Sequence, residues 1–383
     1  MENKRGFKSL VIVFLVLVLF VLLVLFIMRS TAFIGWDFRN NLWGPTYLLT
    51  HNQSPYRIDK LFDLGNAVWL PMAVGLFFPL GFFPLQQASN LWLVSNIIWF
   101  LLIVWISSGS RRPSISLFAI VIFLGLIFPP SVTHLWSGQF SILTTLLFMV
   151  VVIWNNEMPM LLLTLLMAVG LSKPQLAIFV LPGFILYRIR TYGIRNTVQL
   201  IAYLICWVLI LTIPLFLAYP NWLPDFILEI QQNPSWAQPS SLYFLRNAVP
   251  KFGEAIWIVM AIVIFAINIW LWTVLPSRDA VFWSLALTPL ITPYIWTWDF
   301  VMILPLFISS VFQAKTRASL GVLLGGYIVC WILMAGMKIH GEVSDYFFWW
   351  VPWYLVTIII CSKGVRNMKH LVTAFSSFIY KYN

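Results

Sequence analysis

Asp37 is the first of a few charged side chains that stand out in an otherwise apolar chain. It lies in the motif Trp36-Asp37-Phe38-Arg39, about nine residues beyond the apolar run from Leu10 to Met28. A carboxylate held among aromatic side chains loses hydration, which raises its basicity and suits it to act as a general base. The alternatives are a solvated loop acid and an ion-pair partner for Arg39.

Lys173 is the second such residue, and it interrupts an apolar stretch at Ser172-Lys173-Pro174-Gln175. A lysine within a membrane segment costs at least about 2.5 kcal/mol, so it usually faces a cavity and has a partner. A phosphate group is a natural partner for a compact ammonium. The other possible partners are Asp299 and the carbonyl groups of a helix end.

Two further polar corners lie between apolar runs. Asp299 ends the segment TPYIWTWD, where Trp and Tyr also fit the ordinary aromatic belt of a membrane interface. His134 and Gln139 lie in PPSVTHLWSGQFS, where Gly138-Gln139 at a helix start exposes backbone and amide donors to a ligand. A lone histidine such as His134 is more often a satisfied polar residue than a catalyst.

Composition places these residues in a membrane protein. Of the 383 residues, 61% are hydrophobic and 9% are charged, and the mean hydropathy is +0.91. A soluble domain has about 25% charged residues, so this class is excluded. The net charge of +11 comes from short basic clusters between apolar runs, which set topology and do not indicate nucleic acid. The three cysteines lie inside apolar runs and indicate no metal site, and no glycine-rich nucleotide motif occurs.

The apolar runs predict an all-α polytopic membrane protein with roughly 10–13 transmembrane helices. Lys4, Arg5 and Lys8 precede the first run and predict a cytoplasmic N-terminus, and the basic C-terminal tail predicts the same side. Loops 29–66, 219–252 and 337–346 then face outward, and 219–252 is predicted to hold an interfacial helix. The expected spans are 10–28, 88–107, 115–133, 139–154, 198–218, 255–275, 279–292, 300–313, 319–336 and 347–362.

Prolines disturb two other apolar regions. Residues 66–84 are long enough to span but contain Pro71, Pro79 and Pro84, and residues 159–187 contain Lys173-Pro174 at their middle. Because broken helices at membrane depth occur only where protein or a watery cavity satisfies the backbone, we expect residues 170–175 to line a cavity. No repeat or linker divides the chain. We therefore expect a single domain, 1–383, with a catalytic half at about 10–190, C-terminal helices at about 198–362 and a tail at 363–383.

In their order, these motifs resemble glycosyltransferase family 87, whose members are polyprenol-phosphate-mannose-dependent α-1,2-mannosyltransferases of the C-type superfamily. The resemblance covers about residues 30 to 310. Two departures occur: Gln53-Ser54 replaces the glycine that usually comes before the Pro-Tyr-like turn, and Trp298-Asp299 replaces a frequent His pair. The matching elements are Asp37 after the first span, Pro55-Tyr56, Gly138-Gln139, Lys173-Pro174, Pro293 with Trp296, and Leu304-Pro305.

The resemblance implies a C-type glycosyltransferase fold and assigns roles to particular residues. Asp37 would be the general base of an inverting transfer, and Lys173 would bind the donor phosphate with help from Arg39 or Arg246. The substrate-facing residues would be Tyr56, His134, Gln139, Trp296 and Asp299. The donor would be a polyprenyl-phosphate sugar, with no cofactor and no metal.

We therefore expect a plasma-membrane hexosyltransferase, with mannose as the sugar, that acts on a lipid or glycan acceptor at the outer face. The main alternative is a glycolipid flippase or secondary transporter. That class favours related halves and ionisable residues along a midplane pathway, and the sequence has no internal repeat. A third alternative is an enzyme like O-antigen ligases or an acyl-transferring membrane enzyme. A ligase would favour a large outward loop rich in Arg and His. The basic residues of loop 219–252 are only Arg246 and Lys251, and it contains no His.

Overall fold

The computed structural model describes residues 35–62, 69–109, 114–232, 237–339 and 344–363. In these ranges the chain is helical and contains no strand. The predicted first span, 10–28, and nearly all of the predicted tail, 363–383, lie outside the described residues. The α-helices are α2 (Trp36–Phe38), α3 (Gly44–Thr50), α4 (Pro71–Leu76), α5 (Leu85–Ser108), α6 (Ile115–Ile127), α7 (Pro129–Ser137), α8 (Ser141–Ile153), α9 (Met160–Gly170), α10 (Val180–Ala218), α11 (Trp222–Gln232), α12 (Ser241–Ala248), α13 (Gly253–Val274), α14 (Ser277–Ile291), α15 (Leu304–Gln313) and α16 (Arg317–Ile339).

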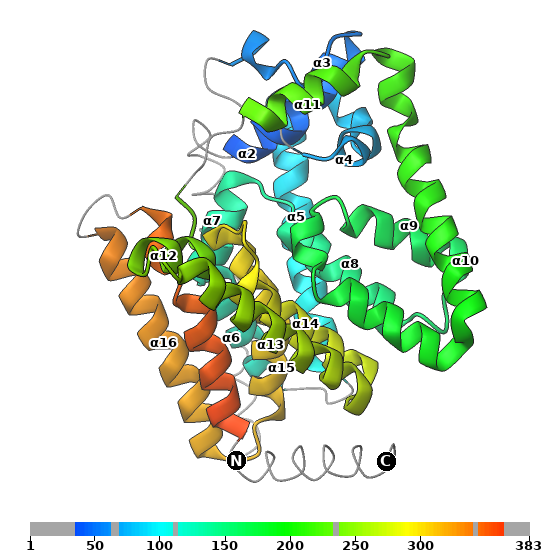
Figure 1. Cartoon of the computed structure of the whole chain (residues 1–383). Coiled ribbons are helices and arrows are strands. Elements are labelled where there is room, and N and C mark those ends of the chain that lie inside the picture. Colours follow the sequence, from blue (N-terminus) through cyan, green and yellow to red (C-terminus); the bar gives the residue numbers. More distant parts are fainter. Residues whose placement is uncertain (1–34, 63–68, 110–113, 233–236, 340–343, 364–383) are drawn as a thin grey trace.

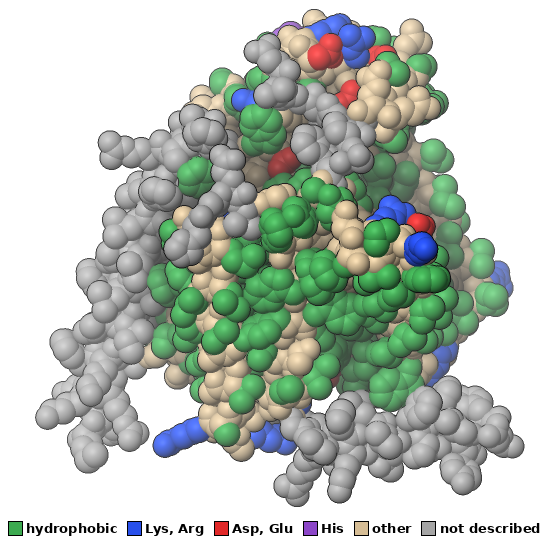
Figure 2. Space-filling view, turned by 60° about the vertical axis from the view of Figure 1, so that its left-hand side comes forward, with side chains coloured by type: hydrophobic (Ala, Val, Ile, Leu, Met, Phe, Trp, Pro, Cys, Tyr) green, Lys and Arg blue, Asp and Glu red, His purple; other side chains and the backbone are tan. Residues whose placement is uncertain are grey.

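Five helices in the described ranges are long and apolar enough to cross a membrane. They are α5, α10, α13, α16 and the last helical segment, Asp345–Lys363, and a sixth span results if the bent pair α6 and α7 is one span. Long helices run side by side through the lower body of the molecule in Figure 1, while α11 lies across its upper end. Apolar side chains cover much of the middle of the surface in Figure 2, while charged side chains lie at the top, at the lower edge and in a group on the right. The prediction of an all-α polytopic membrane protein is confirmed.

Three of the expected spans are helices too short to cross a membrane by themselves. The expected spans 139–154 and 279–292 correspond to α8 with 13 residues and α14 with 15, and 300–313 corresponds to α15 and the end of the 3-10 segment before it, within the short apolar stretch Thr297–Gln313. Most of their side chains are buried against other helices of the protein. Their hydrophobicity therefore reflects burial in the protein core, as is usual for apolar helices of about 10 to 14 residues. The predicted number of 10–13 membrane helices is not reached in the described ranges.

Prolines and one glycine set the main breaks. Pro129 and Pro130 begin α7, which is bent by 64° from α6. In the region 66–84, Pro71 begins α4, a short 3-10 segment follows at Phe78–Phe82, and Pro84 caps α5. This region is a broken element and not a span, because proline removes a backbone donor and cannot continue a helix.

The region 159–187 bends as predicted. Helix α9 ends at Gly170, the backbone leaves regular helix at Lys173, and a 3-10 segment, Pro174–Ala177, leads into α10. The carbonyl of Phe179, next to this break, accepts a hydrogen bond from Asn268 Nδ2 on α13 at 3.0 Å. The neighbouring helix thus satisfies backbone that the break frees.

Helix α10 contains a second break at Gly193, where φ is 82° and ψ is 166°. These angles are accessible essentially only to glycine. The break lies within the basic segment Arg188–Arg195, between the apolar region 159–187 and the expected span 198–218.

The described part of loop 219–252 contains two helices, α11 and α12, where the sequence predicted one interfacial helix. Trp222 at the start of α11 packs with Tyr56, Val74 and Leu215 in one buried cluster. On the outer side of α11, Leu223, Ile227, Leu228 and Ile230 remain exposed. The helix therefore joins the N-terminal elements through one face and leaves an apolar face uncovered, as an interfacial helix does.

Candidate active site

A cavity of about 330 Å³ lies where the short elements of the chain meet, and four of the nine predicted site residues line it. Its walls come from α2, the turn before α8, the break after α9, the corner after α14 and one residue of α11. The lining residues are Asp37, Asn41, Trp69, Leu70, Gln139, Ser172, Lys173, Pro174, Gln175, Ile230, Tyr294, Trp296 and Trp298. The prediction that the break at Lys173 lines a cavity is confirmed.

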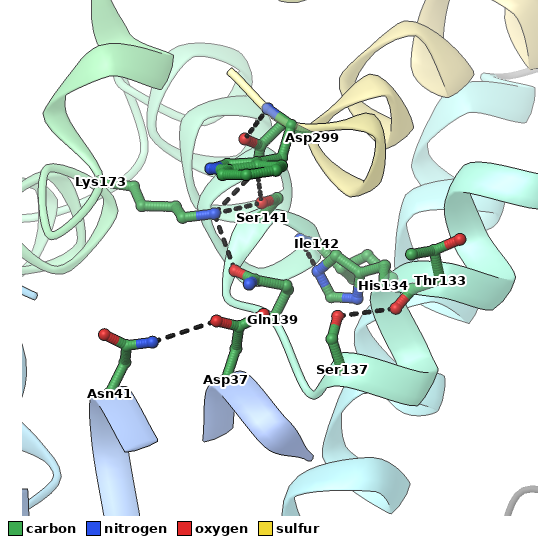
Figure 3. Close-up of polar contacts among 11 residues, drawn as sticks. Asp37, Asn41, Thr133, His134, Ser137, Gln139, Ser141, Ile142, Lys173 and Asp299 are labelled. Carbon is green, nitrogen blue, oxygen red and sulfur yellow. Dashed lines mark hydrogen bonds and ion pairs between the residues drawn. The ribbon is translucent and has the colours of Figure 1, made fainter. Parts of the chain in front are cut away.

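Gly138 brings α2 against the turn between α7 and α8. Its φ of 70° lies in the left-handed region, and a Cβ at this position would come within 2.6 Å of Phe38 Cβ and 3.1 Å of Gly35 Cα. The backbone N–H of Gly35 donates to the carbonyl of Trp136 at 2.6 Å. Glycine is therefore required for both the turn and the close approach, and this contact places Asp37 beside Gln139 (Figure 3).

Lys173 is buried and makes three polar contacts with side chains from two other elements. Its Nζ donates to Gln139 Oε1 at 2.9 Å, to Ser141 Oγ at 3.1 Å and to Asp299 Oδ1 at 2.8 Å. An ammonium group has three hydrogens. All three hydrogens are thus donated. Of the partners that the sequence suggested for Lys173, the structure shows Asp299.

Asp299 has no exposed surface and uses both of its oxygens. Oδ1 accepts from Lys173 and from Ser141 Oγ, while Oδ2 accepts from the backbone N–H of Trp296 at 3.1 Å. The second bond caps the 3-10 segment Thr297–Ile303 and fixes the aromatic corner that lines the cavity. Asp299 therefore anchors this wall and does not itself line the cavity.

Asp37 is the carboxylate that lines the cavity. It is half-buried, and Asn41 Nδ2 donates to its Oδ1 at 3.1 Å. Burial raises the pKa of Asp37 to about 6, although hydrogen bonding by Gln139 and the charge of Lys173 lower it. A carboxylate with this pKa is ionised at neutral pH and is a stronger base than an ordinary aspartate.

Aromatic side chains form another part of the cavity wall. The rings of Trp296 and Trp298 stack with centroids 5.1 Å apart and an interplanar angle of 18°. Tyr294 and Trp69 line the same cavity. Flat aromatic faces with polar edges suit a ligand that presents both apolar and hydroxyl-bearing surfaces.

Two of the predicted phosphate-binding residues do not line the cavity. The guanidinium of Arg39 lies over the rings of Trp36 and Phe62, at 4.8 and 4.3 Å from their centroids, and its Nε donates to Asn40 Oδ1 at 3.0 Å. Arg246 is exposed on α12 and pairs with Glu254 at 3.3 Å.

Two of the predicted substrate-binding residues are buried behind the cavity wall. The Nε2 of His134 accepts the backbone N–H of Ile142 at 3.0 Å, so this ring caps the first turn of α8. Tyr56 packs against Trp222 and Phe226 and donates to the carbonyl of Trp69 at 3.5 Å. Tyr56 thus supports Trp69, and the backbone carbonyl of His134 accepts the N–H of Gln139 at 3.1 Å, so both contact residues that line the cavity.

Asn41 and Ser141 belong to the site but were not predicted, whereas Ser172 and Gln175 lie in the segment 170–175 that was expected to line a cavity. Asn41 follows Asp37 by four residues, which is the spacing of neighbours on one helix face. This spacing could have predicted the contact between the two side chains. Ser141 follows Gln139 by two residues, but its contact with Asp299 spans 158 positions and has no local signal. Among the described residues, no group of three or more His, Cys, Asp or Glu side chains is placed to hold a metal ion.

The comparisons with known proteins give one match. The family model for glycosyltransferase family 87 matches residues 69–293, which include Gln139 and Lys173 but neither Asp37 nor Asp299. Searches of curated proteins and of solved structures found no match.

Proposed function

The chain belongs to glycosyltransferase family 87, and from that premise we propose that it transfers a hexose from a polyprenyl-phosphate donor to a lipid or glycan acceptor. The hexose that we propose is mannose. A membrane glycosyltransferase with several apolar helices can take both substrates from the bilayer. No observation favours the alternative of a glycolipid flippase or secondary transporter over the activity of the family.

One observation carries the proposed mechanism: Asp37 presents an ionised carboxylate with raised pKa to a cavity with aromatic walls. In this mechanism the carboxylate takes the proton of an acceptor hydroxyl as that oxygen attacks the anomeric carbon. The bond between the anomeric carbon and the phosphate oxygen breaks, and polyprenyl phosphate leaves with the electron pair. A single displacement of this kind inverts the anomeric centre and needs one base, unlike the two carboxyls of a glycosidase.

Lys173 is the cation proposed to stabilise the departing phosphate, because it lines the cavity. Its three hydrogens are already donated to Gln139, Ser141 and Asp299, so a donor phosphate would replace one of these acceptors. Arg39 and Arg246 have weaker support as helpers, since neither lines the cavity.

The aromatic wall and α11 support the proposed substrates. The stacked Trp296 and Trp298 offer flat faces for the apolar side of a sugar ring. Ile230 of α11 lines the cavity while being about half exposed at its edge. We propose that the prenyl chain passes this residue into the bilayer.

The proposed location is the plasma membrane, with the cavity open to the outer face and both termini cytoplasmic. Support comes from the basic clusters of the sequence, since Lys and Arg accumulate on the cytoplasmic side. Cysteine labelling of Asn52 in intact cells tests the sidedness. Labelling only after the inner face is opened would contradict it.

The test of the proposed function is Asp37→Asn in the purified full-length protein, assayed with synthetic polyprenyl-phosphate mannose and an acceptor lipid extract. The amide keeps the size of the side chain but cannot accept the proton, and removal of a general base typically lowers the rate by about 10²- to 10⁴-fold. The matched control is Asp59→Asn, because Asp59 is exposed and pairs with Arg57 at 3.1 Å. A near-native transfer rate for Asp37→Asn would refute the mechanism. If the native protein transferred glucose from polyprenyl-phosphate glucose and no mannose, the proposal that mannose is the donor sugar would be refuted.

A further inference from the structure

The charged groups around Asp37 are arranged so that the base is separated from the buried cation by an uncharged side chain. Lys173 and Asp299 are the charged groups that act on the Asp37 carboxyl, and they form an ion pair with each other. Arg39, two residues along the chain, directs its guanidinium to Trp36 and Phe62. Gln139 lies between Lys173 and Asp37 (Figure 3).

The contact with Lys173 determines which end of the Gln139 amide faces Asp37. An ammonium group is only a donor, so the amide atom that it contacts at 2.9 Å has to be the oxygen. The amide nitrogen then points to the other side, where the Asp37 carboxylate is an acceptor. With the opposite orientation, the Gln139 oxygen would face the carboxylate and no hydrogen bond would form.

Lys173 is itself held in one position. Asp299 accepts one hydrogen from its Nζ at 2.8 Å, and Ser141 Oγ lies at 3.1 Å. Asp299 is in turn fixed by the backbone N–H of Trp296. The chain of contacts therefore runs from the aromatic corner through Asp299, Lys173 and Gln139 to the base.

We propose that Gln139 is a positioning residue for Asp37, and that the Lys173–Asp299 ion pair controls the base by fixing the orientation of the Gln139 amide. Gln139 and Asn41 then each direct an amide N–H at the carboxylate, which leaves a carboxylate lone pair free to face the cavity. The function of the ion pair in this arrangement is to orient a neutral group, in addition to any contact of Lys173 with the donor.

The inference rests on the proposed role of Asp37, but its test uses the titration of the carboxyl and not the transfer reaction. Infrared spectra of the purified full-length protein are recorded over a range of pH. The Asp37 band is identified as the carboxylate band that is absent from Asp37→Asn. Its midpoint in the native protein is the reference for every variant.

The decisive measurement is a double-mutant cycle. Gln139→Leu removes the amide donor, and in the native background it should move the Asp37 midpoint upward by about 1 pH unit, because hydrogen bonding to the ionised form lowers a carboxyl pKa. The second background is Lys173→Met/Asp299→Leu, which removes both charges of the pair and leaves no unpaired buried ion. There the Gln139 oxygen has lost the contact that holds the side chain in place, so its hydrogen bond to Asp37 is less ordered and Gln139→Leu should move the midpoint less.

The matched control is Gln199→Leu, since Gln199 is an exposed residue of α10 whose amide bonds Tyr203. It should leave the midpoint in place. An unchanged midpoint in Gln139→Leu, or equal shifts in both backgrounds, would overturn the inference even if Asp37→Asn is inactive. If instead Asp37→Asn transfers sugar normally while the cycle behaves as expected, the proposed function fails and the positioning role stands.

Discussion

Two breaks in the same stretch of chain each hold a buried cation, and the two cations are held in different ways. Lys173 lies at the break after α9 and pairs with the carboxylate of Asp299. Arg188 lies five residues before the break at Gly193 and contacts neutral groups: the side-chain oxygens of Asn155 and Asn196 and the ring of Tyr192, 4.0 Å from its guanidinium. Helices α8 and α9 separate the two sites, a distance of about 20 Å for 13 residues.

The difference shows what a buried charge is used for. A guanidinium spreads its charge over a plane and is satisfied by amide oxygens and an aromatic face, so Arg188 joins the two halves of α10 to the end of α8. The compact ammonium of Lys173 is paired with a carboxylate, and beside the cavity this pair also sets the surroundings of Asp37. We infer that the first break serves the reaction and the second serves the fold.

Breaking the ion pair should give the largest effect on stability. Lys173→Met leaves the Asp299 carboxylate buried without its cation, which should lower the free energy of unfolding by about 3–5 kcal/mol. Unfolding by denaturant in detergent micelles measures this change, and Lys173→Met/Asp299→Leu should recover much of it. The control is Lys338→Met, which removes an exposed pair with Asp345 at 3.0 Å and should cost less than about 1 kcal/mol. If Lys173→Met and Lys338→Met lowered the free energy of unfolding equally, the buried pair would contribute no more to stability than the pair at the surface.

Removing the second cation should cost less. Arg188→Met loses hydrogen bonds from a charged donor to two asparagines, and the free energy of unfolding should fall by about 1.5–3 kcal/mol. Sugar transfer per folded molecule should stay native, and Arg190→Met, at an exposed position, should change neither quantity. A loss of transfer at native stability would give Arg188 a part in the reaction and contradict the comparison.

The second break itself should depend on its glycine. A Cβ at Gly193 meets no atom within 4 Å, so Gly193→Ala is strained only through its backbone angles. We expect a loss of about 1–3 kcal/mol in the free energy of unfolding. Gly325→Ala in α16 also meets open space, but its backbone is regular helix, so it should stabilise the protein slightly. The same unfolding measurement compares the two variants. A native free energy of unfolding for Gly193→Ala would contradict the expected backbone strain at this position.

The smallest expected effect concerns the pH dependence of transfer, which should depend on the site around Lys173 and not on Arg188. Asp37 accepts a proton only when ionised, and its pKa is raised from 3.8 to about 6. The rate should therefore be half-maximal near pH 6, level off about one pH unit above it, and fall about tenfold per pH unit well below it. Initial rates from acidic to neutral pH measure the midpoint. Arg188→Met should leave that midpoint unchanged, and a profile that remains flat well below pH 6 would exclude Asp37 as the base.

Much of the site could be predicted from the sequence because its residues violate a local rule. Lys173 followed by Pro174 conflicts with an apolar helix, and that conflict predicted both the break and the cavity. The partner of Lys173 was one of several possibilities, since Asp299 lies 126 positions away and no local pattern connects them. Contacts of this length follow from how helices pack and are not encoded in a window of sequence.

The number of membrane spans could not be predicted from hydropathy for a similar reason. The apolar side chains of α8 and α14 face other helices, whereas those of α13 and α16 remain largely exposed. A hydrophobic run has the same composition in both settings. Length is the better guide, and it distinguishes the 13 residues of α8 from the 22 of α13.

The Lys173–Asp299 pair also imposes an order on the biosynthesis of the protein. Ribosomes add about 5–20 residues per second, so the 126 residues between the two partners take roughly 6–25 s to make. During this interval the lysine is in the nascent chain without its carboxylate, although Gln139 and Ser141 have already been made. The aromatic corner, the ion pair and the wall beside the base therefore assemble together, only after translation has passed residue 299.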